Sequence, residues 1–124
     1  MKANRSCVGL LTTALALGVV SPAPAHHSHA MFDHAQEVAV TGTVKEFVFR
    51  NPHVMLYVDV KSERGEVVNY WVEMSNIPNM IRRGITQSTF KAGDVVTVRV
   101  HPLKDGRPGG NYVTVTAGDG QTYE

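Results

Sequence analysis

The feature that most constrains the fold of this chain is a two-residue alternation of apolar side chains, repeated in four separate segments. Such a period places every second residue on one face of a β-strand, because successive side chains of a strand point to opposite sides. The apolar residues are mostly valine, which favours strands over helices. The positions predicted to share the core face are Val38, Val40, Gly42 and Val44; Val54, Leu56, Val58 and Val60; Val68, Tyr70, Val72 and Met74; and Val96, Val98 and Val100.

One short helix is expected between the third and fourth of these strands, over residues 75–84. Ser75 or Asn76 can cap its start, because both side chains accept hydrogen bonds from free backbone N–H groups. Pro78 suits the first turn, and Gly84 suits the position just after the end. The segment is too short to be more than two or three turns.

Residues 111–116 are expected to form a fifth strand, followed by a turn and a short tail over 118–124. Five strands with a single helix between the third and fourth is the order of a small OB-like β-barrel. Gly42 favours the barrel, because a glycine inside a strand often marks a bulge or a sharp bend. We therefore predict a mainly β fold, a five-stranded OB-like barrel over residues 37–124, with a β-sandwich or open sheet as the alternative.

The N-terminus is predicted to be a secretory signal peptide over residues 1–25. Lys2 and Arg5 supply its positive charge, residues 8–20 are apolar and uncharged, and Ala23-Pro24-Ala25 has the pattern of a cleavage site. The apolar run is shorter than the roughly 20 residues that span a membrane. We expect cleavage after Ala25, a periplasmic location and no stable membrane insertion of the mature chain.

Cleavage changes the composition on which partner predictions depend. The precursor has 12 Lys and Arg against 11 Asp and Glu, and loss of Lys2 and Arg5 makes the balance slightly acidic. A nearly neutral surface lacks the electrostatic footprint of a nucleic-acid-binding protein, so we expect no nucleic-acid partner. Cys7, the only cysteine, is also removed. The mature domain therefore has no internal disulfide and depends on its apolar core.

Five short motifs, taken together, resemble a known family. They are His-His-Ser at 26–28, Thr-Gly-Thr-Val at 41–44, Asn-Pro-His at 51–53, Arg-Arg-Gly at 82–84 and Ala-Gly-Asp at 92–94. Their order is similar to that in a family of small exported proteins of Gram-negative bacteria, known only as a domain of unknown function. The resemblance implies export and an OB-like fold but no activity. At His29 this chain departs from the family, where an aromatic residue is expected.

Histidines gather at the predicted mature N-terminus, and another follows the first strand. Neutral imidazole binds zinc, copper and nickel, and histidine-rich tracts are a metal-binding composition. The candidate ligands are His26, His27, His29 and His53, and copper is the favoured ion because it heads the divalent affinity order. The alternative interpretation is a solvated polar arm over residues 26–36 that binds no metal. Both interpretations stay open.

Aromatic residues offer an alternative function, recognition of a partner protein or an envelope glycan through the barrel face. OB-folds bind oligonucleotides and oligosaccharides, often on aromatic side chains. Trp71 is the candidate platform, because it lies on the strand face opposite Val72. His101, which precedes Pro102 at a strand end, is expected to be structural.

Catalysis has little support in the sequence. The mature chain lacks cysteine, and its serines do not lie in the strand-turn-helix context of a hydrolase nucleophile. Its glycine pairs also lack the strand-to-helix setting of a phosphate-binding loop. We therefore expect a non-enzymatic binding module.

The exported protein is predicted to begin at His26. Intact mass spectrometry of the secreted form measures this directly, because each alternative cleavage site gives a different mass. A secreted form that still contains residues 1–25 would contradict the signal-peptide prediction.

Overall fold

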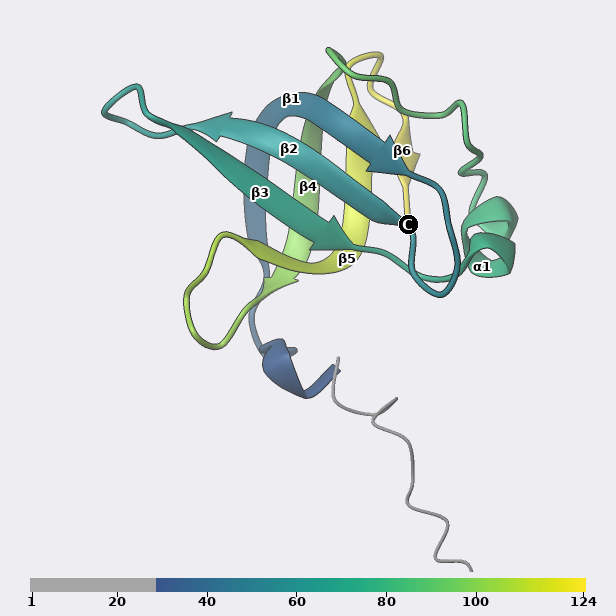
Figure 1. Cartoon of the computed structure of the whole chain (residues 1–124), viewed down its shortest axis with the longest axis horizontal. Coiled ribbons are helices and arrows are strands. Elements are labelled where there is room, and N and C mark those ends of the chain that lie inside the picture. Colours follow the sequence, from purple (N-terminus) through teal and green to yellow (C-terminus); the bar gives the residue numbers. More distant parts are fainter. Residues whose placement is uncertain (1–28) are drawn as a thin grey trace, which may run out of the picture.

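The computed structural model describes residues 29–124, and Figure 1 shows the order of its elements. The predicted signal peptide, His26 and His27 lie outside the described residues. The elements are η1 (His29–Met31), β1 (Val38–Val48), β2 (Met55–Lys61), β3 (Val67–Glu73), α1 (Ile77–Arg82), β4 (Val95–Pro102), β5 (Gly109–Ala117) and β6 (Thr122–Tyr123).

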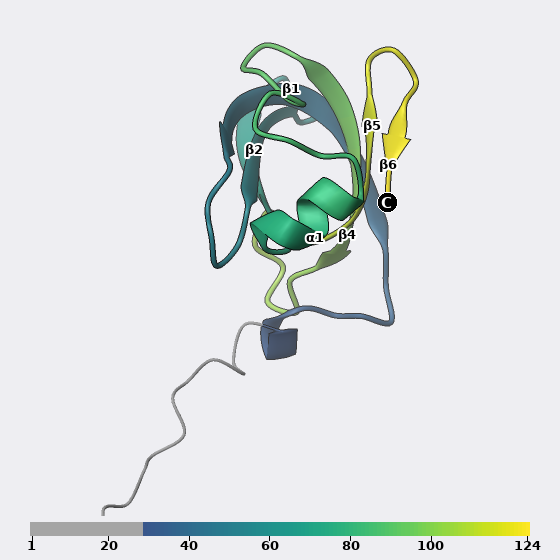
Figure 2. The same ribbon diagram turned by 90° about the vertical axis from the view of Figure 1, so that its right-hand side faces the viewer.

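Five strands close into a barrel, which confirms the predicted fold. The strand order is β3-β2-β1-β4-β5-β6, and an additional pairing of β3 with β5 completes the ring. All neighbouring strands are antiparallel except β3 and β5, which are parallel. β1 serves both halves of the barrel, because its first part pairs with β4 and its second part pairs with β2. Figure 2 shows α1 across one end of the barrel.

The core follows the predicted alternation closely. Val54, Leu56 and Val58 of the second predicted segment are fully buried, and so are the predicted valines of β4. Val38, Val40, Val60 and Tyr70 are partly buried, and Val68 is exposed, with 36% of its surface accessible. The β2–β3 hairpin projects beyond the ring in Figure 1, so no facing strand covers its tip. The alternation thus predicts the face of Val68 but not its burial.

The bend in β1 differs in detail from the prediction. The bulge lies between Val44 and Glu46, not at Gly42. Gly42 is required for a different reason, because a Cβ atom there would clash with the backbone carbonyl oxygen of Asp59 on β2. Close approach of two strands, followed by a bulge, lets β1 turn from one half of the barrel to the other.

The helix forms within its predicted limits. Asn76 is the N-cap, and its side chain accepts a hydrogen bond of 3.0 Å from the backbone N–H of Asn79. Gly84 follows the helix with a φ of 79°, a left-handed conformation that glycine adopts readily. Met80 is fully buried and anchors α1 to the core. Within residues 29–124, no helix has the length and apolar character needed to cross a membrane.

The C-terminal tail contains a strand that the sequence did not predict. β6 pairs with β5 through Val115 with Tyr123 and Thr116 with Thr122, outside the closed ring. It is only 2 residues long, too short to produce an alternation pattern. The Tyr123 ring packs edge-on against Phe90, with ring centres 5.5 Å apart, so tertiary contact rather than local pattern holds the strand.

Residues 29–36, expected as an extended arm, instead pack against the barrel. Phe32 is only 1% exposed, and its ring centre lies 6.0 Å from that of Trp71. Phe32 also forms a β-bridge with Leu103. The Asp33 N–H donates a 2.8 Å hydrogen bond to the carbonyl oxygen of Pro102. Burial of one aromatic ring therefore joins this segment to the β4–β5 connection.

Val58→Asp is predicted to destabilise the barrel by several kcal/mol, roughly 3 to 5, because an unpaired carboxylate would be buried in the core. Val67→Asp is the matched control, since Val67 lies on the neighbouring strand with 60% of its surface exposed. Urea denaturation of both variants measures the difference. Similar free energies of unfolding for the two would contradict the buried position of Val58.

Candidate functional site

A polar cavity of about 210 Å³ lies near one end of the barrel. It forms where the loop between β1 and β2 meets the end of β3, the end of α1 and the start of β5. Most of its lining is polar or charged. The polar residues that line it are His29, His53, Glu73, Ser75, Arg83, Asn111 and Tyr112.

Two predicted metal ligands, His29 and His53, line this one cavity. His29 reaches it from the segment before the barrel, because Phe32 anchors that segment. His53 reaches it from the loop after β1, and the Asn51 side chain ties this loop to α1 by accepting a 2.9 Å hydrogen bond from the Ile77 N–H. The structure therefore brings together two histidines that the whole of β1 separates in sequence.

Glu73 positions His53. The Nδ1 atom of His53 lies 3.5 Å from Oε1 of Glu73, whose side chain is only 12% exposed. The loop residue His53 is thus held against β3. A carboxylate beside Nδ1 favours the tautomer that carries a proton there, which leaves Nε2 free to bind a ligand.

The described residues supply only part of a metal site. In residues 29–124, no three His, Cys, Asp or Glu side chains are arranged so that they could hold a metal ion together. His26 and His27 lie outside the described residues. A metal ion at His29 and His53 would therefore need further donors.

The cavity lining also includes a cation and a phenol, Arg83 and Tyr112. The guanidinium carbon of Arg83 lies 5.5 Å from the centre of the Tyr112 ring, in cation–π range. Burial raises the pKa of the Tyr112 hydroxyl, and the nearby Arg83 charge offsets this only in part. The hydroxyl oxygen is buried and has no hydrogen-bond partner among the described residues. Arg83, which follows α1, therefore contributes a positive charge to the cavity lining.

Ser75, His53 and Glu73 line the cavity together, which raises the question of a hydrolase triad. The Ser75 Oγ atom accepts a 2.7 Å hydrogen bond from the Asn79 side chain. No hydrogen bond joins Ser75 to His53 within the described part of the chain. A nucleophile needs such a contact with its base, so these three residues do not form that arrangement as they lie.

Trp71, the candidate binding platform, is partly covered by the chain itself. Phe32 packs beside its ring, and Gly109 of β5 lies so close that a Cβ atom there would be 2.7 Å from the indole. The Trp71 ring is therefore a packing surface for the N-terminal segment and β5. The ring stays partly exposed, with Phe32 and β5 beside it.

Comparison with known proteins identifies the family. A family described as one of unknown function, DUF6152, matches residues 14–112. The chain belongs to the DUF6152 family. This confirms the predicted membership of a family of unknown function, whereas export and a Gram-negative source stay predictions. No curated protein matches the chain.

The fold of this DUF6152 protein is also found in a solved structure of low sequence identity. The crystal structure of the mitochondrial single-stranded DNA binding protein Rim1 from S. cerevisiae superposes with a TM-score of 0.51 at 12% identity. The match covers 66% of this chain and 92% of the Rim1 chain. At this identity the likeness shows the fold alone.

Sequence reasoning missed five polar cavity residues of the DUF6152 chain, namely Glu73, Ser75, Arg83, Asn111 and Tyr112. Parallel pairing of β3 with β5 places Glu73 beside Asn111, and the Asn111 side chain donates a 3.3 Å hydrogen bond to the Glu73 carbonyl oxygen. No spacing in the sequence signals this contact, because it depends on closure of the barrel. The local signals for this cavity were the histidine-rich N-terminus, which contains His29, and the Asn-Pro-His motif, which contains His53.

Tyr112→Phe is predicted to leave the free energy of unfolding unchanged or to raise it by up to about 1 kcal/mol. The reason is that a buried hydroxyl without a partner costs about 1 to 3 kcal/mol, which its removal recovers in part. Chemical denaturation measures the change, with Tyr57→Phe at a half-buried position as the control. A loss of more than about 1 kcal/mol in Tyr112→Phe alone would show that the hydroxyl has a partner.

Proposed function

We propose that the mature protein is a periplasmic, non-enzymatic binding module that holds a transition-metal ion, preferably copper, at its histidine-rich N-terminus. The observation that carries this proposal is the meeting of His29 and His53 in one polar cavity. Glu73 supports His53 as a ligand, because ligating histidines commonly donate their second ring N–H to a carboxylate.

The remaining donors would come from His26 and His27. Cleavage after Ala25 would give His26 a free α-amino group beside its own imidazole, and these two nitrogens can chelate one ion. The α-amino pKa is about 7.7 to 8.0, so copper displaces its proton with little cost near neutral pH. Copper(II) is favoured because it suits tetragonal nitrogen ligation and heads the divalent affinity order.

Chain length allows this chelate to reach the cavity. Three residues of extended chain span at most about 11 Å. His26 is three residues before His29, which itself lines the cavity. The α-amino group, two or three imidazoles and the supported His53 ring could therefore meet around one ion.

A second candidate function is recognition of a partner protein or an envelope glycan through the outer barrel face. A shallow groove of about 500 Å³ is lined by residues of β1, β2, β3 and β4. Val67 and Val95, 60% and 56% exposed, border it beside Thr41 and Thr43. An exposed apolar patch next to hydroxyl groups is typical of an interaction surface. Nucleic acid is not proposed as the partner, given the slightly acidic mature chain and the partly covered Trp71 ring.

Insertion of one alanine before His26 is the sharpest test of the copper proposal. The insertion keeps every imidazole but separates the α-amino group from the His26 ring. We expect the mature protein to bind copper(II) more tightly than the uncleaved precursor, and the insertion to weaken copper binding about tenfold and to change the visible absorption spectrum. Equal affinity and an identical spectrum in the variant would rule out a chelate built on the His26 amine.

His53→Ala tests the part that the cavity plays. We expect weaker copper binding, by about tenfold, because one nitrogen ligand is lost. Arg83→Ala is the matched control, since Arg83 lines the same cavity but cannot ligate a metal ion. If His53→Ala and Arg83→Ala both left copper affinity unchanged, the cavity would have no part in the site and recognition of a partner would become the leading function.

A further inference from the structure

A second pair of histidines lies outside the cavity. The ring centres of His34 and His101 are 4.8 Å apart, with an angle of 64° between the ring planes. His34 is exposed and His101 is partly exposed, so both are accessible from solvent. His34 belongs to the N-terminal segment and His101 to β4, and neither lines the cavity with His29 and His53.

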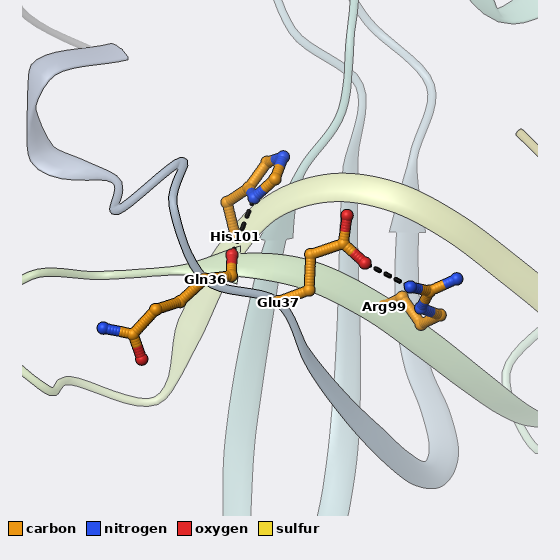
Figure 3. Close-up of polar contacts among 4 residues, drawn as sticks. All are labelled: Gln36, Glu37, Arg99 and His101. Atoms are coloured by element: carbon orange, nitrogen blue, oxygen red, sulfur yellow. Dashed lines mark hydrogen bonds and ion pairs between the residues drawn. The ribbon is translucent and has the colours of Figure 1, made fainter.

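His101 is already oriented as metal-ligating histidines are. Its Nδ1 atom lies 2.8 Å from the backbone carbonyl oxygen of Gln36. A carbonyl can only accept a hydrogen bond, so the proton of the neutral ring is on Nδ1 and Nε2 keeps its lone pair. Figure 3 shows the second ring nitrogen pointing away from Gln36. A backbone carbonyl in this position fixes the tautomer and increases the basicity of the ligand nitrogen.

The separation of the two rings fits coordination of one ion. An imidazole nitrogen lies about 2.0 Å from a zinc or copper ion and about 1.1 Å from its own ring centre. Two imidazoles that meet at an angle of about 90° to 110° therefore have ring centres about 4.4 to 5.1 Å apart. The observed 4.8 Å falls within this range. The His29 ring centre lies 6.2 Å from that of His34, outside this range for adjacent ligands, so the pair is defined by His34 and His101.

Neighbouring contacts hold the two backbones in place. The hydrogen bond from the Asp33 N–H to the Pro102 carbonyl oxygen, 2.8 Å long, joins the residue before His34 to the residue after His101. An ion pair between Glu37 and Arg99 joins the same two segments (Figure 3). Arg99 lies two residues before His101 on β4. Within residues 29–124, the only hydrogen bond of the His34 ring is a long one, 3.3 Å, to the carbonyl oxygen of His29. The His34 ring can therefore turn about its soft terminal torsion while its backbone stays fixed.

We propose that His34 and His101 form a second metal site, a bis-imidazole site for a divalent transition-metal ion, completed by water. Neutral imidazole pairs suit copper(II), nickel(II) and zinc(II), with copper bound most tightly. The site does not depend on cleavage of the signal peptide or on His26, so it is independent of the copper chelate proposed above. It also gives His101 a role beyond the structural one expected from its place before Pro102.

Copper(II) titration of a mature variant in which His26, His27, His29 and His53 are all alanine tests this site alone. Native mass spectrometry and calorimetry of this variant are expected to show one copper ion per chain. Adding His34→Ala or His101→Ala is expected to weaken binding about tenfold or more, because a single imidazole cannot chelate. Asn79→Ala, on α1, is the control and is expected to leave the copper affinity of this variant unchanged.

Nuclear magnetic resonance of the same variant gives an independent readout that does not require further mutation. Substoichiometric copper(II) is expected to broaden the amide signals around His34 and His101 first and to leave those around Gly65, at the hairpin tip, sharp. Absence of binding, uniform broadening, or unchanged affinity in His34→Ala and His101→Ala would overturn the proposal. Since the N-terminal chelate is removed from this variant, none of these outcomes bears on the function proposed for it.

Discussion

Parallel pairing of β3 with β5 is the contact on which the barrel and the cavity both depend. It joins the two ends of the sheet, which would otherwise leave two open edges, and it sets Glu73 beside Asn111. Glycine makes the contact possible, because a Cβ atom at Gly109 would lie 2.7 Å from the backbone carbonyl oxygen of Trp71 on β3. Closing the ring and building the cavity wall are therefore consequences of one close backbone approach.

Packing of residues 29–36 against the barrel is the second feature on which the candidate sites depend. Phe32 is buried between the barrel and the β4–β5 connection, and its burial places His29 at the cavity and His34 beside His101. The same ring covers part of Trp71. The segment that carries the histidines thus also packs beside Trp71, on the kind of aromatic surface that OB-folds commonly use for ligands. This packing is one reason why a metal ion, and not nucleic acid, is the proposed ligand.

Much of the fold could be predicted because its causes are local. The alternation of valine with polar residues determines which face of each strand is buried, and Asn76, Pro78 and Gly84 limit the helix by backbone chemistry. β6 and the burial of Phe32 could not be predicted in this way. Each rests on contacts with residues distant in sequence, Phe90 for β6 and Leu103 for Phe32, and neither segment is long enough to show a period.

For the candidate sites, the sequence by itself determined which chemical groups are available: histidines near the predicted mature N-terminus, His53 after Asn-Pro, and a domain whose fold holds them without disulfides. Only the tertiary structure decided which of these groups meet. His29 joins His53 and Glu73, and His34 joins His101, because barrel closure and the burial of Phe32 bring distant segments together. The physical reason is that ligand geometry depends on distances across the barrel, whereas local sequence pattern reports only the direction of each side chain along its own strand.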